Sequence, residues 1–112
     1  MTRVCFTLQV APEKLDAYRA AHAAVWPDML RALKDTGWHD YRLYLRPDGL
    51  LVGVLETEDF AAAQDAMART EVNPRWQAAM AEFFPSLGEA RPDEGMFVLD
   101  EIFHLEAQLE AL

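Results

Sequence analysis

The sequence predicts an α+β fold in which a four-stranded antiparallel sheet carries helices on one face. Three observations lead to this prediction. Residues 4–10 alternate between apolar and polar side chains, as a half-buried strand does. An apolar stripe with helical spacing follows from Leu15 to Leu33. A Pro-Asp-Gly turn at residues 47–49 then joins two further apolar segments, which indicates an antiparallel hairpin.

The first strand, residues 4–10, precedes a helix that we expect from Pro12 to about Thr36. Proline is common at the first position of a helix, because its fixed φ angle suits the first turn. Gly37 follows the last expected turn, where glycine is the usual residue.

Pro27 lies inside this predicted helix. It has no N–H to donate to the carbonyl of Ala23, and its ring crowds the preceding turn. We therefore expect a kink or a break at Pro27, which would turn Trp26 relative to His22.

The hairpin consists of strands predicted at Tyr41–Leu45 and Leu50–Glu56, joined by the turn at residues 46–49. Because residues 50–56 are nearly all apolar, this strand is expected to lie in the middle of the sheet. Trp38 precedes the hairpin and is expected to pack against the sheet edge.

A second helical region is predicted in two pieces. The first runs from Phe60 to Arg69, and the second starts with Asn73 as N-cap and Pro74 as first helical residue, ending at Pro85. The inner faces are expected to hold Phe60, Ala63 and Met67 in the first piece, and Trp76, Met80 and Phe83 or Phe84 in the second.

The last part of the chain completes the predicted sheet. Residues 86–94 contain glycine and proline and are predicted to be a loop, and Met96–Leu105 is predicted to be the fourth strand. The resulting order β-α-β-β-α-β is that of a ferredoxin-like domain. We expect one such domain at residues 1–105, followed by a helical or frayed tail at residues 106–112.

Charge and composition limit the expected partners and location. The net charge of −9 disfavours nucleic acid and anionic membrane surfaces. No apolar run approaches the roughly 20 residues of a membrane-spanning helix, the start has no signal-peptide pattern, and Cys5 is the only cysteine, so we expect a cytoplasmic protein. Helices on one sheet face leave the other uncovered, and a homodimer is the expected way to cover it.

The residue pattern leaves acid/base chemistry as the favoured class. His22, His39 and His104 are far apart in sequence, with no carboxylate at ligand spacing, so no metal site is expected unless the fold assembles one. No Gly-x-Ser-x-Gly motif points to a nucleophile, and no glycine-rich loop follows a strand.

Tyr18 and His22 lie four residues apart on the inward stripe of the first helix. An imidazole on that face is either a core histidine bonded to a backbone carbonyl or a catalytic group that gives and takes protons near neutral pH. Trp76 likewise is either a core residue or a platform on which a sugar ring stacks.

Several short motifs recur together in one known family. They are Tyr18-Arg19-Ala20-Ala21-His22, Val25-Trp26-Pro27-Asp28-Met29, Asp40-Tyr41, Arg75-Trp76 and Glu101-Ile102-Phe103-His104. Through these motifs the chain resembles, over residues 4–105, the L-rhamnose mutarotase family of small dimeric ferredoxin-like proteins.

The resemblance implies an isomerase that interconverts the α and β anomers of L-rhamnose, or of a related 6-deoxy sugar, without cofactor or metal. His22 matches the proton-donating histidine of the family, and Tyr18 and Tyr41 match its substrate-binding tyrosines. Trp76 matches the first of two adjacent tryptophans that line the sugar site. Gln77 replaces the second, and its amide is expected to hydrogen-bond a sugar hydroxyl instead.

Anomer exchange requires the anomeric hydroxyl to lose a proton while the ring oxygen gains one. His22 is expected to act as the acid toward the ring oxygen, with Tyr18 orienting the sugar or the imidazole. The base is left open between Glu101, Asp28 and a water molecule. Two other functions also stay open: a cofactor-independent monooxygenase of the dimeric ferredoxin-like type, and a binding domain without catalysis.

Overall fold

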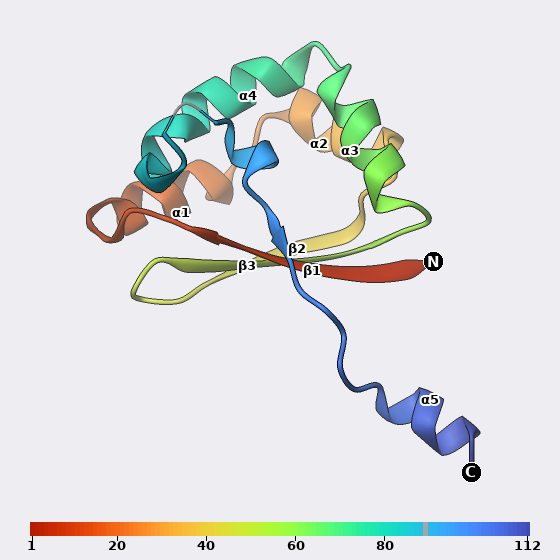
Figure 1. The fold of residues 1–112 in the computed structure, drawn as a ribbon. Helices are drawn as coiled ribbons and strands as arrows, with labels where there is room; N and C mark the ends of the chain where they lie inside the picture. The colour runs from red at the N-terminus through yellow and green to blue at the C-terminus, as the bar shows by residue number, and fades with distance from the viewer. Residues whose placement is uncertain (89) are drawn as a thin grey trace.

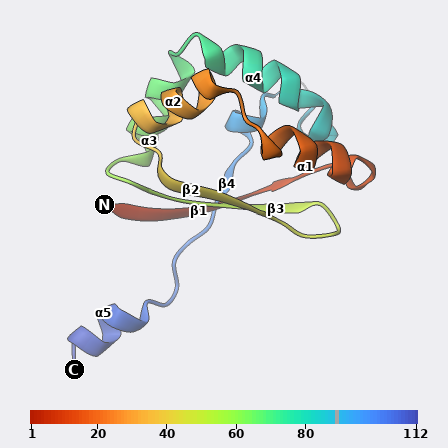
Figure 2. The ribbon, with the colours of Figure 1, turned by 180° about the vertical axis from the view of Figure 1, so that it is seen from behind.

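Four antiparallel strands form one sheet in the computed structural model, which describes residues 1–88 and 90–112. The strands are β1 (Thr2–Gln9), β2 (His39–Leu45), β3 (Leu50–Thr57) and β4 (Phe97–Val98), in the spatial order β2-β3-β1-β4. In the described part of the chain, the helices that pack on the sheet all lie on the same face (Figures 1 and 2). The predicted ferredoxin-like arrangement is confirmed.

β3 lies between β2 and β1, as its apolar sequence predicted. Along β1, Val4, Phe6 and Leu8 point toward the helices and are buried. Phe6 pairs with Gly53 across the two strands, and a Cβ atom at position 53 would overlap the Phe6 ring. The glycine therefore makes room for the aromatic side chain in the middle of the sheet.

The first helical region is broken, as Pro27 predicted. A short 3-10 turn, η1 (Pro12–Lys14), leads into α1 (Leu15–Ala23), and α2 (Pro27–Asp35) begins at the proline itself. Trp26 has an extended backbone conformation, so the chain leaves the helix between the two pieces. Gly37 follows α2 with a φ angle of 98°, the left-handed conformation that glycine adopts readily.

The second helical region consists of α3 (Phe60–Ala68), α4 (Val72–Met80) and the 3-10 turn η2 (Ala81–Phe83). The prediction that Asn73 caps α4 is wrong, because the helix begins two residues earlier than predicted, at Val72, with Glu71 in the N-cap position. The Asn73 side chain is buried and donates a hydrogen bond to Asp93, 20 residues away. Its oxygen accepts from Gln77 Nε2 and not from a backbone N–H of the first helical turn, as the oxygen of an N-cap would. The predicted inner faces are buried or half-buried at Phe60, Ala63, Met67, Trp76, Met80, Phe83 and Phe84.

The segment predicted as a loop contains two short 3-10 turns, η3 (Pro85–Leu87) and η4 (Pro92–Glu94). The part of that loop prediction that falls on Glu89 lies outside the described residues. The η4 turn approaches α4, so this connection forms part of one wall of the cavity described below.

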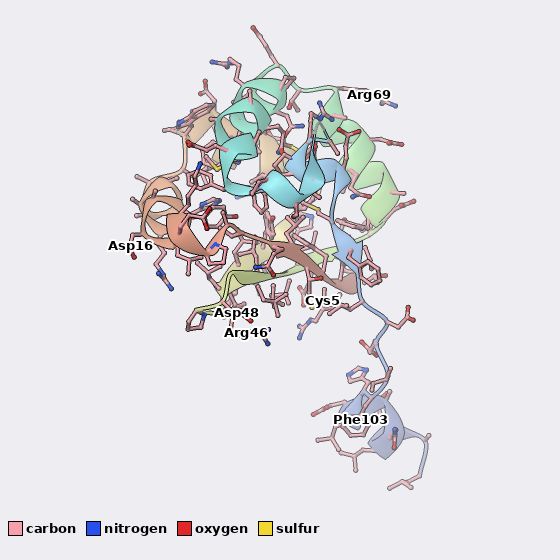
Figure 3. The ribbon with its side chains drawn as sticks, turned by 60° about the vertical axis from the view of Figure 1, so that its left-hand side comes forward. Cys5, Asp16, Arg46, Asp48, Arg69 and Phe103 are labelled. Carbon is pink, nitrogen blue, oxygen red and sulfur yellow. The ribbon has the colours of Figure 1, made fainter. Side chains whose placement is uncertain are left out.

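The prediction of a ten-residue fourth strand at 96–105 is wrong, since only Phe97 and Val98 pair with β1. The backbone N–H of Leu99 still donates to the Cys5 carbonyl of β1 at 2.8 Å. After Leu99 the chain leaves the sheet and ends in α5 (Leu105–Glu110), which lies apart from the rest of the fold (Figure 1). Phe103 on this segment is 61% exposed (Figure 3). The apolar side chains that suggested a strand here, such as Ile102 and Phe103, are exposed in the described structure.

The core lies between the sheet and the helices, with Phe6 and Leu51 fully buried on the two middle strands. Trp38 packs against Tyr41 of the edge strand, as predicted, with ring centroids 5.1 Å apart, and it also contacts Phe60 of α3 at 5.5 Å. None of the helices in the described residues is long and apolar enough to cross a membrane.

Candidate active site

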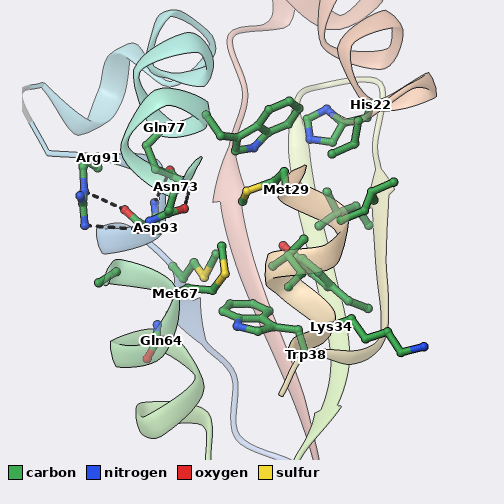
Figure 4. Close-up of a pocket in the computed structure, with 18 of the residues that line it drawn as sticks. His22, Met29, Lys34, Trp38, Gln64, Met67, Asn73, Gln77, Arg91 and Asp93 are labelled. Atoms are coloured by element: carbon green, nitrogen blue, oxygen red, sulfur yellow. Dashed lines mark hydrogen bonds and ion pairs between the residues drawn. The ribbon is translucent and has the colours of Figure 1, made fainter. Parts of the chain in front are cut away.

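A cavity of about 730 Å³ lies between the α1–α2 region, α3, α4 and the edge strand β2. Figure 4 shows His22 at one end of this cavity and Lys34 and Trp38 at the other. An adjoining hollow of about 60 Å³ shares part of its lining. Both spaces are lined by His22, Tyr41, Trp76 and Gln77, and the smaller one also by Tyr18. The structure therefore brings the five predicted site residues together.

His22 is half-buried, and its Nδ1 atom lies 3.0 Å from the carbonyl oxygen of Tyr18. Because a carbonyl can only accept, Nδ1 must carry the proton, and the neutral ring then has its lone pair at Nε2. Burial lowers the pKa of His22 below its usual value of 6.5, and the hydrogen bond to the Tyr18 carbonyl opposes that shift in part. At neutral pH the ring is therefore mainly neutral, with a basic Nε2.

Aromatic rings surround the imidazole. The Tyr18 ring centroid is 4.3 Å from that of His22, and the Trp76 centroid is 5.5 Å away in an edge-on arrangement. Trp26 packs edge-on against Trp76 at 5.0 Å, a contact made by the extended residues between α1 and α2. Tyr18 is fixed from behind by Phe83 at 5.3 Å. The imidazole and the Trp76 indole are thus held in place before a ligand arrives.

Both candidate tyrosines are neutral phenols. Burial raises the pKa values of Tyr18 and Tyr41 well above the usual value of 10. A neutral phenol can donate one hydrogen bond and accept others, which suits the hydroxyl groups of a sugar.

A polar network from α4 and η4 forms the opposite wall (Figure 4). Gln77 Nε2 donates to Asn73 Oδ1 at 3.1 Å, and Gln77 Oε1 accepts from the backbone N–H of Asp93 at 3.1 Å. The Asp93 carboxylate accepts from Asn73 Nδ2 at 3.0 Å and forms an ion pair with Arg91 at 3.1 Å. The two hydrogen bonds of the Gln77 amide therefore hold the η4 turn against α4.

Two carboxylates that the sequence suggested as the base lie elsewhere. Asp28 is exposed and 3.5 Å from Arg31, and Glu101 is exposed and 4.0 Å from His104. Neither lines the cavity. Asp93, which sequence reasoning missed, is the carboxylate among the described residues that lines both spaces together with His22.

No cluster of three or more histidine, cysteine, aspartate or glutamate side chains in residues 1–88 and 90–112 is arranged to hold a metal ion. The groups that the cavity does offer are a proton-transfer imidazole, aromatic rings, two phenols and a polar wall. Fold and site together define a ferredoxin-like domain suited to acid/base chemistry on a small ligand with an apolar face and several hydroxyls.

Sequence comparison agrees with this class. The model of the L-rhamnose mutarotase family matches residues 3–105. The L-rhamnose mutarotase of Pectobacterium atrosepticum is 34% identical over 107 residues, which cover 95% of this chain and 100% of the relative. That of Klebsiella pneumoniae is 37% identical over 106 residues, covering 94% and 99%. The chain belongs to the L-rhamnose mutarotase family, as its motifs predicted.

Two solved structures share the fold. An L-rhamnose mutarotase from Formosa agariphila superposes with a TM-score of 0.73 at 21% identity, covering 93% of this chain and 98% of the other. An antibiotic biosynthesis monooxygenase superposes with a TM-score of 0.58 at 17% identity, covering 92% and 100%. At these identities the likeness concerns the fold alone, so it is the family match that separates the mutarotase from the monooxygenase alternative.

Proposed function

We propose that this protein is a mutarotase that interconverts the α and β anomers of L-rhamnose, or of a related 6-deoxy sugar, by opening and reclosing the ring. The observation that carries the proposal is the position of His22, whose Nδ1 is bonded to a backbone carbonyl while its ring borders a cavity shared with Trp76. The names of the relatives support the same activity.

The proposed reaction needs one histidine nitrogen. Nε2 of neutral His22 takes the proton of the anomeric hydroxyl, the bond between the anomeric carbon and the ring oxygen breaks, and its electron pair stays on the ring oxygen. The imidazolium then gives the proton to that oxygen. The open aldehyde rotates, and the reverse steps close the ring on its other face.

This sequence of steps keeps His22 as the proton donor to the ring oxygen and makes it the base beforehand. One nitrogen can reach both oxygens, because both are bonded to the same carbon. Neither Asp28 nor Glu101, which lie outside the cavity, is then required. The proposed chemistry uses no metal and no cofactor.

The other residues bind and orient the sugar. Trp76 offers an apolar surface to the C–H face of the ring. Tyr18 and Tyr41 contribute phenol hydroxyls, and Asp93 contributes a carboxylate. Gln77 retains one amide N–H beyond the bond to Asn73, and this N–H is the proposed donor to a sugar hydroxyl.

Replacement of His22 by alanine tests the proposal. Because a positioned acid/base group contributes about 10²–10⁴-fold, His22→Ala should abolish most of the acceleration of anomer exchange, measured by NMR saturation transfer. His104→Ala is the matched control, since His104 is exposed and outside the cavity. Circular dichroism should show both variants folded. Full acceleration in folded His22→Ala would remove His22 from the mechanism.

We also propose that the protein works as a homodimer. The sheet face opposite the helices and the segment that follows β4 expose apolar side chains that a lone domain would leave in water. These are Tyr44, Phe97, Val98, Leu99, Ile102 and Phe103. A second copy is the occupant that would cover them symmetrically. In this arrangement residues 1–105 are the domain, and residues 106–112 are its tail.

A cytoplasmic location fits the cysteine content. Cys5 is half-buried and is the only cysteine of the chain, so the protein forms no internal disulfide. A reducing compartment suits such a protein. We propose the cytoplasm on this basis, and cell fractionation of the tagged protein would test it.

A further inference from the structure

The cavity is larger than a single 6-deoxy sugar needs. Such a sugar has roughly eleven non-hydrogen atoms, each occupying less than the ~30 Å³ share of a water molecule, so it fills less than about 330 Å³. The cavity measures about 730 Å³. With a sugar ring against His22, more than half of the space is left, and it extends toward Trp38 and Lys34 (Figure 4).

The end remote from His22 is a formed surface with mixed chemistry. The Trp38 ring is held by a hydrogen bond from its Nε1 to the Ala63 carbonyl at 3.3 Å, and it is nearly completely buried. Lys34 and Gln64 flank it in Figure 4, and Asp65 also lines the cavity. An indole, an amide, a cation and a carboxylate together offer an apolar contact plus hydrogen-bond donors and acceptors.

We propose that this remote end is a second subsite, which receives a neutral hexose linked to the sugar that reacts at His22. The inference rests on the proposed function and extends its substrate class to reducing disaccharides. The anomeric carbon and the ring oxygen must face His22, so the opposite ring edge, with O3 and O4, points along the cavity. The second ring is therefore attached at O3 or O4.

The charged groups that line the cavity favour a neutral second ring over an acidic one. The carboxylates of Asp40 and Asp65 line the cavity beside the single ammonium group of Lys34, and the chain carries a net charge of −9. An acidic sugar would meet net repulsion there. The reaction at the reducing end is unchanged, and the bond between the two rings is not broken.

Disaccharides of this kind have an identifiable chemical source. A glycoside hydrolase that cuts a longer chain releases its product as one anomer, which depends on whether the enzyme retains or inverts the configuration. A mutarotase with two subsites would bring that product to anomeric equilibrium before the two rings are separated.

NMR saturation transfer on the whole protein tests the inference with three probes: L-rhamnose, and L-rhamnose carrying glucose at O3 or at O4. We expect at least one disaccharide to be accelerated to within about tenfold of L-rhamnose. Acceleration of L-rhamnose but of neither disaccharide would overturn the second subsite and leave the proposed function intact. Acceleration of no probe would overturn both.

A space-filling variant locates the second ring. Ala68 lines the cavity on α3, one helical turn from Gln64, so Ala68→Phe puts a phenyl ring on the cavity wall beside the proposed second subsite. It should lower the ratio of disaccharide to L-rhamnose exchange by about tenfold or more, through steric exclusion. Ala62→Phe, which is exposed on the same helix and outside the cavity lining, should leave the ratio unchanged. An unchanged ratio in Ala68→Phe would contradict the placement.

Discussion

The carbonyl of Tyr18 decides which nitrogen of His22 can exchange protons with a ligand. It holds the proton on Nδ1, so only Nε2 changes its protonation state near neutral pH. The histidine that bonds the backbone is thus the same one that borders the cavity. The two interpretations of His22 are therefore compatible: Nδ1 makes the structural bond to the backbone, and Nε2 is free for proton transfer.

The pH dependence of the reaction should reveal the starting state of His22. Burial holds its pKa below 6.5, and the neutral ring is the form that can take the anomeric proton. Below that pKa the ring is protonated and cannot. The enzymatic acceleration should therefore rise with pH through the His22 pKa and then level off, measured over about pH 5–8. The ring-proton NMR signals of His22 should titrate with the same midpoint. A rate that falls with rising pH would instead mean that the imidazolium starts the reaction.

Trp76 should contribute to sugar binding as well as to the core. Loss of the indole from the cavity wall removes the stacking surface, so Trp76→Ala should raise the dissociation constant for L-rhamnose by about two- to tenfold, as aromatic contacts of about 0.5–1.5 kcal/mol suggest. Trp26→Ala is the matched control, because Trp26 packs on Trp76 but does not line the cavity. Calorimetry should show a much smaller change for the control. Equal dissociation constants in wild type and folded Trp76→Ala would leave Trp76 as a core residue only.

At the scale of elements, the close fit of the Phe6 ring over Gly53 joins β1 and β3 in the middle of the sheet. Gly53→Ala would force a methyl group into the buried Phe6 ring and should lower the free energy of unfolding by about 1–3 kcal/mol. Val54→Ala, the next residue on the same strand, is half-buried on the other face and should cost less than about 1 kcal/mol. Urea unfolding measures both. Equal losses would mean that Phe6 moves aside.

Local chemistry explains which elements were predictable. The break at Pro27 and the turn at residues 47–49 follow from the backbone properties of proline and glycine, and both are present in the structure. The length of β4 was not predictable. The apolar alternation at 96–105 indicates that one face of this segment will be covered, but it does not show whether the cover is the neighbouring strand of the same chain or another surface. In the chain described here, only two of those residues have a strand partner.

The site was predictable only in part for the same reason. Tyr18 and His22 are neighbours through helical spacing, which sequence shows directly. Asn73 and Asp93 meet only because the chain folds back over α4, and a side chain at a helix start is more often a cap than a link to a distant turn. Long-range polar networks of this kind leave no local signal.

At the scale of the whole molecule, the uncovered sheet face predicts self-association. Size-exclusion chromatography with light scattering at micromolar concentration should give a mass of twice 12.7 kDa. Val54→Asp, which places a charge on that face, should shift the protein toward monomer, whereas Glu110→Ala near the chain end should not. A wild-type mass of one chain at this concentration would contradict the proposed dimer.

The break before Pro27 has a consequence for how firmly the catalytic wall is held. α1 and α2 have nine residues each, fewer than the ~12–15 that an isolated helix needs to persist in water. Isolated helices of this length depend on packing against their neighbours, so we expect this segment to open locally more often than the strands beneath it. A sugar that bridges His22 and Trp76 would fasten α1 to α4, and catalytic competence and local rigidity would then increase together as substrate binds.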